Sequence, residues 1–299
     1  MGDEQGGDSR TAKAMKSAFF GSSRFSVFIL DELEKAGLSP VLIVTTPDKP
    51  VGRKLKLTPT PVKEWAKARN IKTLEPAKLD MTFADQLKGE SCDVFIVASY
   101  GKIIPGNIID IPPHKTLNVH PSLLPKYRGA SPLQSAMLDD AKETGISIMR
   151  IDEKMDEGPV IVQKPITIKE WPIYEKFEED MAREGGILLA GSLYKYIAGE
   201  MKEKPQNHSQ ATYTKKVTKE DGLLDLSAAD QYLNFRKIQA YHEWPTAYFF
   251  VAKDGKNMRV KVTAASFKDG KLAIEKVVPE AGREMDYEDF KRGLGSSNV

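Results

Sequence analysis

The clearest structural signal in this chain is Asn118-Val119-His120-Pro121-Ser122-Leu123-Leu124-Pro125. Asn118 and His120 are two residues apart, so on an extended segment their side chains point to the same face. Asp156 follows 38 residues after Asn118, which is about the length of one strand, helix, strand unit and would return it to the same end of a parallel sheet. Ligands bind at that end of open α/β sheets. The sequence therefore predicts that these three side chains meet one substrate there.

Apolar runs alternate with helix-like segments on both sides of this stretch. Strands are predicted at 18–20, 41–45, 94–98 and 146–148, and helical patterns cover 25–33, 62–69, 81–88, 130–140 and 175–199. The alternation predicts an α/β fold with a doubly wound parallel sheet. Beyond a polar stretch, a helix is predicted at 228–240 and short strands at 247–252, 258–264 and 271–278. Strands separated by Asp-Gly turns favour a small antiparallel sheet or barrel.

Length and composition are those of an ordinary globular chain. Its 299 residues are 40% hydrophobic and 29% charged, which allows a sizeable core and about two domains. We predict a disordered leader at 1–15, a first domain at 16–200, a linker at 201–212 and a second domain at 213–299. The single cysteine, Cys92, excludes an internal disulfide, and no apolar run approaches the roughly 18 residues of a membrane span. A cytoplasmic location without membrane contact is expected.

The basic residues are unevenly distributed. Between Thr45 and Lys72 there are eight basic residues and two acidic ones, while the whole chain carries a net charge of only +2. A basic segment in an otherwise acidic chain suits a phosphate backbone as partner. A solvated loop followed by a lysine-rich helix face explains the same pattern, so charge alone leaves both interpretations open.

An amide, an imidazole and a carboxylate can together carry out acyl transfer between two nitrogens. The Asn118 side chain can donate to an oxygen that gains negative charge. His120 can polarise that oxygen or move a proton, and Asp156 can fix the tautomer of His120. A structural histidine, hydrogen bonded within a loop, remains the alternative for His120 considered alone. His114, His208 and His242 have no Cys, Asp or Glu partner at metal-ligand spacing, so no metal is expected.

A longer match adds to this chemistry. The segments 118–129 and 155–158 resemble the signature of the 10-formyltetrahydrofolate-dependent formyltransferase family. The segment 45–63 resembles the loop of those members that act on methionyl-tRNA, and 100–105 also fits the family. The resemblance covers roughly residues 16 to 290. It implies a Rossmann-like first domain that binds folate, followed by a small OB-like β-barrel.

The resemblance also implies residue roles. Asn118, His120 and Asp156 match the catalytic positions of the family. The folate-contacting positions correspond to Ser122, Leu123, Leu124, Pro125, Tyr100 and Gly101. The positions that meet the tRNA acceptor end correspond to Arg53, Lys54, Lys56 and Lys49, and Gly52 would let that loop flex. The expected activity is formyl transfer from 10-formyltetrahydrofolate to the α-amine of initiator methionyl-tRNA, by a monomer without metal.

The chain departs from the family pattern in three places. Gly21-Ser22-Ser23 stands for the usual Gly-Thr-Pro, Leu226 stands where a Trp is common, and the interval from Lys261 to Arg283 is short for the barrel. The last departure predicts a shortened second domain. Two rival functions stay open: a relative that formylates an amino sugar or hydrolyses formyl folate, and a non-enzymatic RNA-binding module with a vestigial triad.

Overall fold

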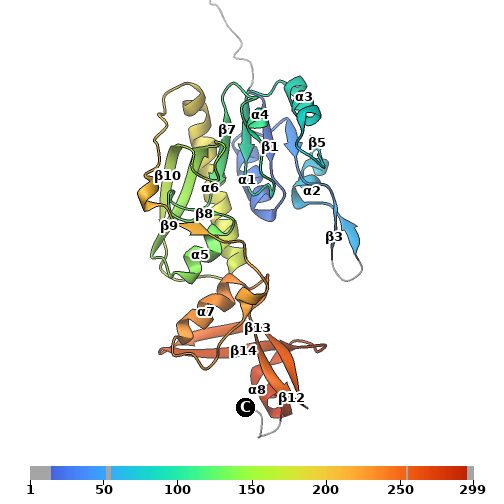
Figure 1. The fold of residues 1–299 in the computed structure, drawn as a ribbon, viewed down its shortest axis with the longest axis vertical. Helices are drawn as coiled ribbons and strands as arrows, with labels where there is room; N and C mark the ends of the chain where they lie inside the picture. The colour runs from blue at the N-terminus through green and yellow to red at the C-terminus, as the bar shows by residue number, and fades with distance from the viewer. Residues whose placement is uncertain (1–14, 52–54, 254, 295–299) are drawn as a thin grey trace, which may run out of the picture.

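The computed structural model describes residues 15–51, 55–253 and 255–294, so the predicted leader, apart from its last residue, lies outside the described residues. Two parts lie one above the other along the longest axis (Figure 1). The upper part is built on a large central sheet, and the lower part on a small antiparallel sheet. Within the described ranges, no helix is long and apolar enough to cross a membrane.

The central sheet has seven strands in the order β10-β9-β7-β6-β1-β2-β5. Its strands are β1 (Ser17–Phe20), β2 (Leu42–Val44), β5 (Lys72–Leu74), β6 (Val94–Val97), β7 (Thr116–His120), β9 (Glu143–Arg150) and β10 (Val160–Thr167). Its helices are α1 (Arg24–Lys35), α2 (Pro61–Ala68), α3 (Met81–Glu90), α4 (Gly106–Ile109), α5 (Pro132–Leu138) and α6 (Tyr174–Ile197). Two small pairs accompany the sheet: β3 (Lys49–Val51) with β4 (Lys56–Thr58), and β8 (Arg128–Gly129) with β11 (Tyr213–Thr214).

The five strands from β5 to β7 are parallel, which confirms a mostly parallel α/β fold. The strand at 146–148 is longer than expected and runs antiparallel to β7, with His120 opposite Ser147. The prediction that Asp156 returns through a parallel crossover is therefore wrong. A buried apolar run does not reveal the direction of a strand, because both directions bury the same side chains. Asp156 instead lies in the loop between β9 and the antiparallel edge strand β10.

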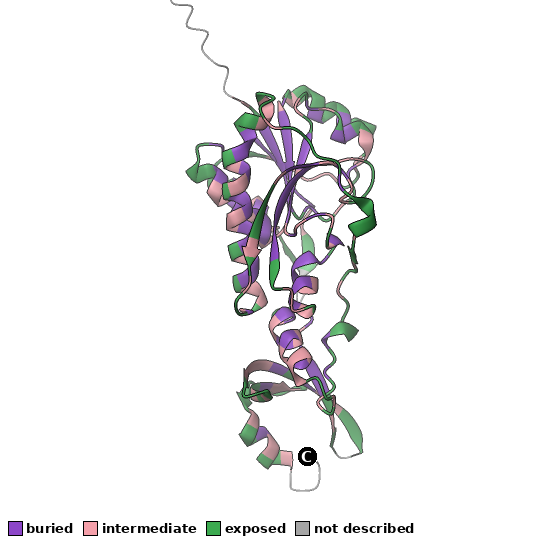
Figure 2. Ribbon diagram, turned by 90° about the vertical axis from the view of Figure 1, so that its left-hand side faces the viewer, coloured by how far each residue is buried: buried purple, intermediate pink, exposed green. Residues whose placement is uncertain are grey.

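The central sheet is covered on both faces, and its strands form the buried centre of the upper part (Figure 2). Alternate residues of each strand enter different cores: Phe19 packs with the α1 and α6 side, and Phe20 with the α3 and α4 side. α6 approaches β7 closely because Gly185 has no side chain there. A Cβ on Gly185 would lie 2.7 Å from Val119 Cγ1. The doubly wound arrangement follows from this alternation.

Cys92 lies between α3 and β6 with 4% of its surface exposed. Burial raises the pKa of its thiol to about 11. An ordinary cysteine has a pKa of about 8.5, so at pH 8 the thiolate, which is the reactive form, is at least about a hundredfold scarcer in the folded chain. We expect iodoacetamide to alkylate the native chain at pH 8 at least about a hundredfold more slowly than the urea-unfolded chain. Labelling at comparable rates, read by mass spectrometry, would contradict this packing.

The lower part contains a four-stranded antiparallel sheet, consistent with a small barrel. Its elements are α7 (Gln231–Ala240), β12 (Tyr248–Lys253), β13 (Lys256–Lys268), β14 (Lys271–Pro279), β15 (Met285–Asp286) and α8 (Tyr287–Leu294), preceded by the 3-10 turns η1 (His208–Gln210) and η2 (Glu220–Gly222). The pairing of β13 with β14 shifts register around Ala264, which bends the long hairpin. Phe249, Val260 and Phe290 belong to its own small core.

α7 joins the two parts. It lies between the upper sheet and the β13–β14 hairpin (Figure 1). Arg236 donates from Nη1 to the Leu138 carbonyl at the end of α5, and the Tyr232 hydroxyl donates to Asp140 Oδ1 at 3.3 Å. The Trp171 indole nitrogen donates to the same carboxylate oxygen at 2.9 Å. The contacts of Arg236 and Tyr232 fix α7 against the upper part, so the small sheet has a defined position relative to the large one.

Candidate active site

Strand β7 presents Asn118 and His120 on one face, as the two-residue spacing predicts. Val119, between them, packs in the core on the α6 side, so its two neighbours point to the opposite face. Asn118 is half-buried, and His120 is only 4% exposed. The Asn118 side chain is therefore more accessible than the His120 imidazole.

The ring of His120 is held by a backbone carbonyl. His120 Nε2 lies 3.0 Å from the Tyr127 carbonyl oxygen. A carbonyl only accepts, so Nε2 carries the proton and donates it, and Nδ1 is the nitrogen that can exchange a proton. Asp156 was expected to set this tautomer, but Tyr127 does so.

Asp156 faces the other ring nitrogen. Its Oδ1 lies 3.8 Å from His120 Nδ1, too far for a hydrogen bond but close enough for a strong charge interaction when the ring is protonated. Its Oδ2 accepts a hydrogen bond from the Gly129 backbone N–H at 2.8 Å. Asp156 itself has φ +55°, a left-handed conformation that is uncommon outside glycine. The carboxylate is thus held from β8 and directed toward the imidazole.

A buried guanidinium lies behind this loop. Arg128 is completely buried, and its Nε and Nη2 donate to Gln206 Oε1 at 3.1 and 2.8 Å. Its Nη1 donates to the Tyr213 hydroxyl at 3.0 Å and lies 3.3 Å from Glu157 Oε1. Arg128 lies in the segment 118–129 that carries the family resemblance, but no role was predicted for it, and Gln206 was assigned only to the polar linker. Arginine is rarely buried and glutamine in a polar stretch carries no pattern, so the sequence does not indicate that these two side chains pair.

The predicted folate positions divide into buried and accessible ones. Ser122 and Leu124 are buried, and the Ser122 hydroxyl donates to the Lys126 carbonyl at 2.6 Å. Leu123 and Pro125 are partly exposed. These four residues form one turn, which Ser147 supports by donating to the Ser122 carbonyl at 2.6 Å. Contact with a ligand is open to Leu123 and Pro125 and not to the buried side chains.

The other two folate positions follow β6. The Tyr100 side chain is buried, packs edge-on against Phe20 with ring centroids 5.5 Å apart, and has its pKa raised to about 12 by burial. Its hydroxyl has no hydrogen-bond partner among the residues that the structure describes. Gly101 is exposed with φ +78°. Gly101 therefore offers accessible backbone, while Tyr100 belongs to the core beneath it.

The basic segment forms a projecting hairpin. β3 and β4 pair with Lys49 opposite Thr58, and Lys49 and Lys56 are exposed. Arg53 and Lys54, with Gly52, lie outside the described residues. Three other basic residues of the segment are in ion pairs, Lys63 with Asp48 and Glu75, Arg69 with Glu34 and Lys72 with Glu90. Exposed cations therefore occur on the hairpin, at Lys49 and Lys56, and on helix α2, at Lys67.

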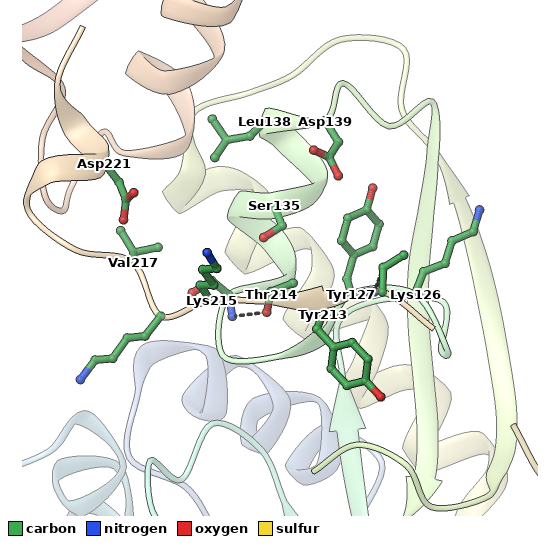
Figure 3. A pocket seen from close by; sticks show the side chains of 13 residues that line it. Lys126, Tyr127, Ser135, Leu138, Asp139, Tyr213, Thr214, Lys215, Val217 and Asp221 are labelled. Atoms are coloured by element: carbon green, nitrogen blue, oxygen red, sulfur yellow. Dashed lines mark hydrogen bonds between the residues drawn. The ribbon is translucent and has the colours of Figure 1, made fainter. Parts of the chain in front are cut away.

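A cavity of about 550 Å³ lies beside the site, between α5 and the segment 212–217. Tyr127, whose carbonyl holds His120, is part of its wall, with Ser135, Leu138 and Asp139 on the α5 side (Figure 3). Lys215 and Lys216 line it from the other segment. Burial, together with the nearby Asp139 carboxylate, raises the pKa of the Tyr127 phenol to about 12. In the described part of the chain, no group of three or more His, Cys, Asp or Glu side chains could hold a metal ion.

Comparison with known proteins assigns this chain to a family. Residues 15–191 match the family model described as formyl transferase. The chain is 38% identical over 269 residues to a methionyl-tRNA formyltransferase of Chloroflexus aurantiacus, which covers 90% of this chain and 86% of that protein. The match therefore extends well beyond the first domain.

Solved structures share the fold at low sequence identity. A methionyl-tRNA formyltransferase from Clostridium thermocellum superimposes with a TM-score of 0.57 at 16% identity, over 91% of this chain and 99% of that one. A sugar N-formyltransferase from a Shewanella species gives 0.62 at 16% identity, over 85% and 99%. The fold is thus common to enzymes with different acceptors. The chain belongs to the formyltransferase family and, within it, to the methionyl-tRNA formyltransferases.

Proposed function

We propose that this enzyme transfers the formyl group of 10-formyltetrahydrofolate to the α-amino group of initiator methionyl-tRNA, with Asn118, His120 and Asp156 as its catalytic residues. The observation that carries the proposal is the His120 Nδ1 to Asp156 Oδ1 distance of 3.8 Å, on the face of β7 that also bears Asn118. The similarity to methionyl-tRNA formyltransferases over 90% of the chain supports the choice of acceptor.

The acceptor brings its own nucleophile. An α-amine has a pKa of about 7.7 to 8.0, so a large part of it is neutral near pH 7 and attacks without a strong base. The bond from the amine nitrogen to the formyl carbon forms first. The bond from that carbon to the folate nitrogen then breaks. A proton must pass from the attacking nitrogen to the leaving one.

His120 can carry this proton at one atom only. Because Nε2 donates to the Tyr127 carbonyl, the ring accepts the proton of the amine at Nδ1 and returns it to the folate nitrogen from there. While the ring is charged, the Asp156 carboxylate at 3.8 Å stabilises it. The role of Asp156 is therefore electrostatic.

Asn118 is the donor for the negatively charged oxygen of the tetrahedral intermediate. Its side-chain NH₂ donates in the neutral state and needs no proton transfer before it acts. His120 can share this task only after its Nδ1 has been protonated, because Nε2–H is already used. The two residues thus act at successive stages, with Asn118 present from the first approach of the amine.

The donor and the tRNA are assigned to different sets of residues. Leu123, Pro125 and the Gly101 backbone are the accessible members of the predicted folate set. The β3–β4 hairpin, with Lys49 and Lys56, is assigned to the acceptor end of the tRNA, as are Arg53 and Lys54. A cytoplasmic enzyme that works as a monomer stays the prediction from the sequence.

Replacing both exposed lysines of the hairpin, Lys49→Ala with Lys56→Ala, is expected to raise KM for methionyl-tRNA and leave kcat unchanged. Each phosphate that a lysine neutralises adds about 1 to the slope of log KM against log salt, so the double variant should lower this slope by about 2. Initial rates between 50 and 200 mM salt measure this. The variant Lys35→Ala with Lys88→Ala, exposed lysines on α1 and α3, is the control. An unchanged slope would remove the hairpin from the tRNA interface.

Transfer of labelled formyl from 10-formyltetrahydrofolate tests the proposed reaction. Charged initiator methionyl-tRNA should acquire the label on its amine, released as N-formylmethionine when the ester is hydrolysed. Uncharged tRNA should acquire none. Absence of transfer to the charged tRNA, with a folded enzyme, would contradict the proposal.

A further inference from the structure

We propose that Gln206, from the stretch between the two parts, is a positioning residue that holds Asp156 in its orientation toward His120. The inference rests on the proposed function, because it assigns Gln206 a role through Asp156. Gln206 lies 50 positions after Asp156 along the chain, in a segment that its composition marks only as a polar linker. It is nevertheless 8% exposed, whereas its neighbours 202–205 and 207–210 are exposed.

Both N–H groups of the Gln206 side-chain amide donate to backbone carbonyls of the loop that contains Asp156. Nε2 donates to the Asp156 carbonyl at 2.8 Å and to the Gly158 carbonyl at 2.7 Å. These carbonyls stand on either side of residue 157, so one side chain fixes the peptide groups on both sides of the turn. On the far side the loop is closely packed: a Cβ on Gly158 would lie 2.0 Å from the Arg150 carbonyl oxygen. The loop is thus held between Gln206 and β9.

Arg128 determines which way the amide points. Its Nε and Nη2 both donate to Gln206 Oε1, at 3.1 and 2.8 Å. A guanidinium has donors only, so the oxygen of the amide must face Arg128 and the nitrogen must face the loop. The residue after Arg128 is Gly129, whose N–H donates to Asp156 Oδ2 at 2.8 Å. Asp156 is therefore held in two ways. Gln206, oriented by Arg128, fixes its backbone, and the Gly129 N–H, next to Arg128, fixes its carboxylate.

Asp156 needs such support because of its backbone conformation. At φ +55° a residue with a Cβ carries a steric penalty that the surroundings must offset. Without the two hydrogen bonds from Gln206, the turn can relax toward an ordinary conformation. That movement would carry the carboxylate away from Nδ1, and misplacement by about 1 Å of a group that acts on the transition state can cost about a hundredfold in rate.

Gln206→Glu tests the role with little change in shape. The variant keeps an acceptor for Arg128, but in place of the two N–H donors it puts a carboxylate oxygen against the Asp156 and Gly158 carbonyls, so attraction of the loop is replaced by repulsion. We expect kcat to fall at least about tenfold while KM for each substrate stays within about twofold. Gln210→Glu, the same change at an exposed position four residues on, should match the wild type. Gln206→Met, uncharged and of similar length, provides a second variant if the first does not fold.

A double-mutant cycle separates positioning from general structural support. Single turnovers with enzyme in excess are measured for Gln206→Glu, Asp156→Asn and the double variant, with thermal melting for each. If Gln206 acts through Asp156, its replacement in the Asp156→Asn background should cost less than about twofold. A full tenfold loss in both backgrounds, or wild-type kcat in Gln206→Glu, would overturn the inference. Near-normal turnover in Asp156→Asn alone would instead overturn the proposed role of Asp156.

Discussion

His120→Ala and Asn118→Ala should each lower kcat for formyl transfer by at least about a hundredfold, on the scale of removing one oxyanion donor, about 2.7 to 4 kcal/mol of barrier. Alanine at 118 removes the donor for the charged oxygen. Alanine at 120 removes the imidazole whose Nδ1, the proposed proton carrier, lies 3.8 Å from Asp156 Oδ1. Initial rates at saturating donor and methionyl-tRNA measure both effects.

The fold should survive these changes. Asn118 is half-buried, and loss of His120 leaves the Tyr127 carbonyl without this donor, a cost of about 1 to 3 kcal/mol. His114→Ala, a histidine just before β7, is the matched control and should keep wild-type turnover. A loss smaller than about tenfold in a folded variant would refute the role of that residue.

Arg128→Met should lower the free energy of unfolding by about 3 to 5 kcal/mol, the usual cost of breaking a buried ion pair. The guanidinium is completely buried and bonds to Gln206 and Tyr213, with Glu157 at 3.3 Å. Methionine fills much of the volume but cannot donate, so the buried Gln206 Oε1 loses both of its Arg128 donors and the Glu157 carboxylate loses its neighbouring cation. Urea titration followed by fluorescence measures the difference.

Arg150→Met is the matched control for this variant. Arg150 pairs with Glu203 at 3.0 Å, but both side chains are about a third exposed. Solvent screens such a pair, so its removal should cost under about 1 kcal/mol. Equal stabilities of Arg128→Met and Arg150→Met would show that the buried guanidinium contributes no more than a surface cation.

The spacing of apolar and polar residues along the sequence predicts those helices and strands that follow a regular pattern. β7 occurs where the spacing of Asn118 and His120 requires an extended segment, and most of the predicted helices and strands of the upper part are present. Short strands at 247–252, 258–264 and 271–278, separated by Asp-Gly turns, predicted the small antiparallel sheet. These features depend on local patterns, and local patterns are visible in one sequence.

Features that depend on distant partners were missed. The direction of β9 and the existence of β10 are examples: β10 contains Pro165, which weakens a strand pattern and is tolerated here because β10 is an edge strand. The tautomer of His120 is set by a carbonyl seven residues away in the chain, and the Arg128–Gln206 pair joins positions 78 residues apart. Neither an arginine nor a glutamine indicates, from the sequence alone, which distant residue it will contact.

The acceptor is the point at which related enzymes differ. A sugar N-formyltransferase shares this fold with a TM-score of 0.62, so the sheet and the loops around β7 do not select an acceptor by themselves. The features of this chain that bear on the choice are the exposed lysines of the β3–β4 hairpin and the small sheet fixed in place through α7. An RNA-binding module without activity would not need Asp156 to lie close to His120. Nor would it need the buried Arg128–Gln206 pair that holds the Asp156 loop.

Competition between acceptors tests the central claim most directly. Initiator methionyl-tRNA and a nucleotide-linked amino sugar are offered together with labelled 10-formyltetrahydrofolate, and the label is counted in formylmethionine, formylated sugar and free formate. Our account predicts that the label enters the methionyl amine and neither of the other products. Label in the sugar, or formate released at the same rate without any acceptor, would contradict it.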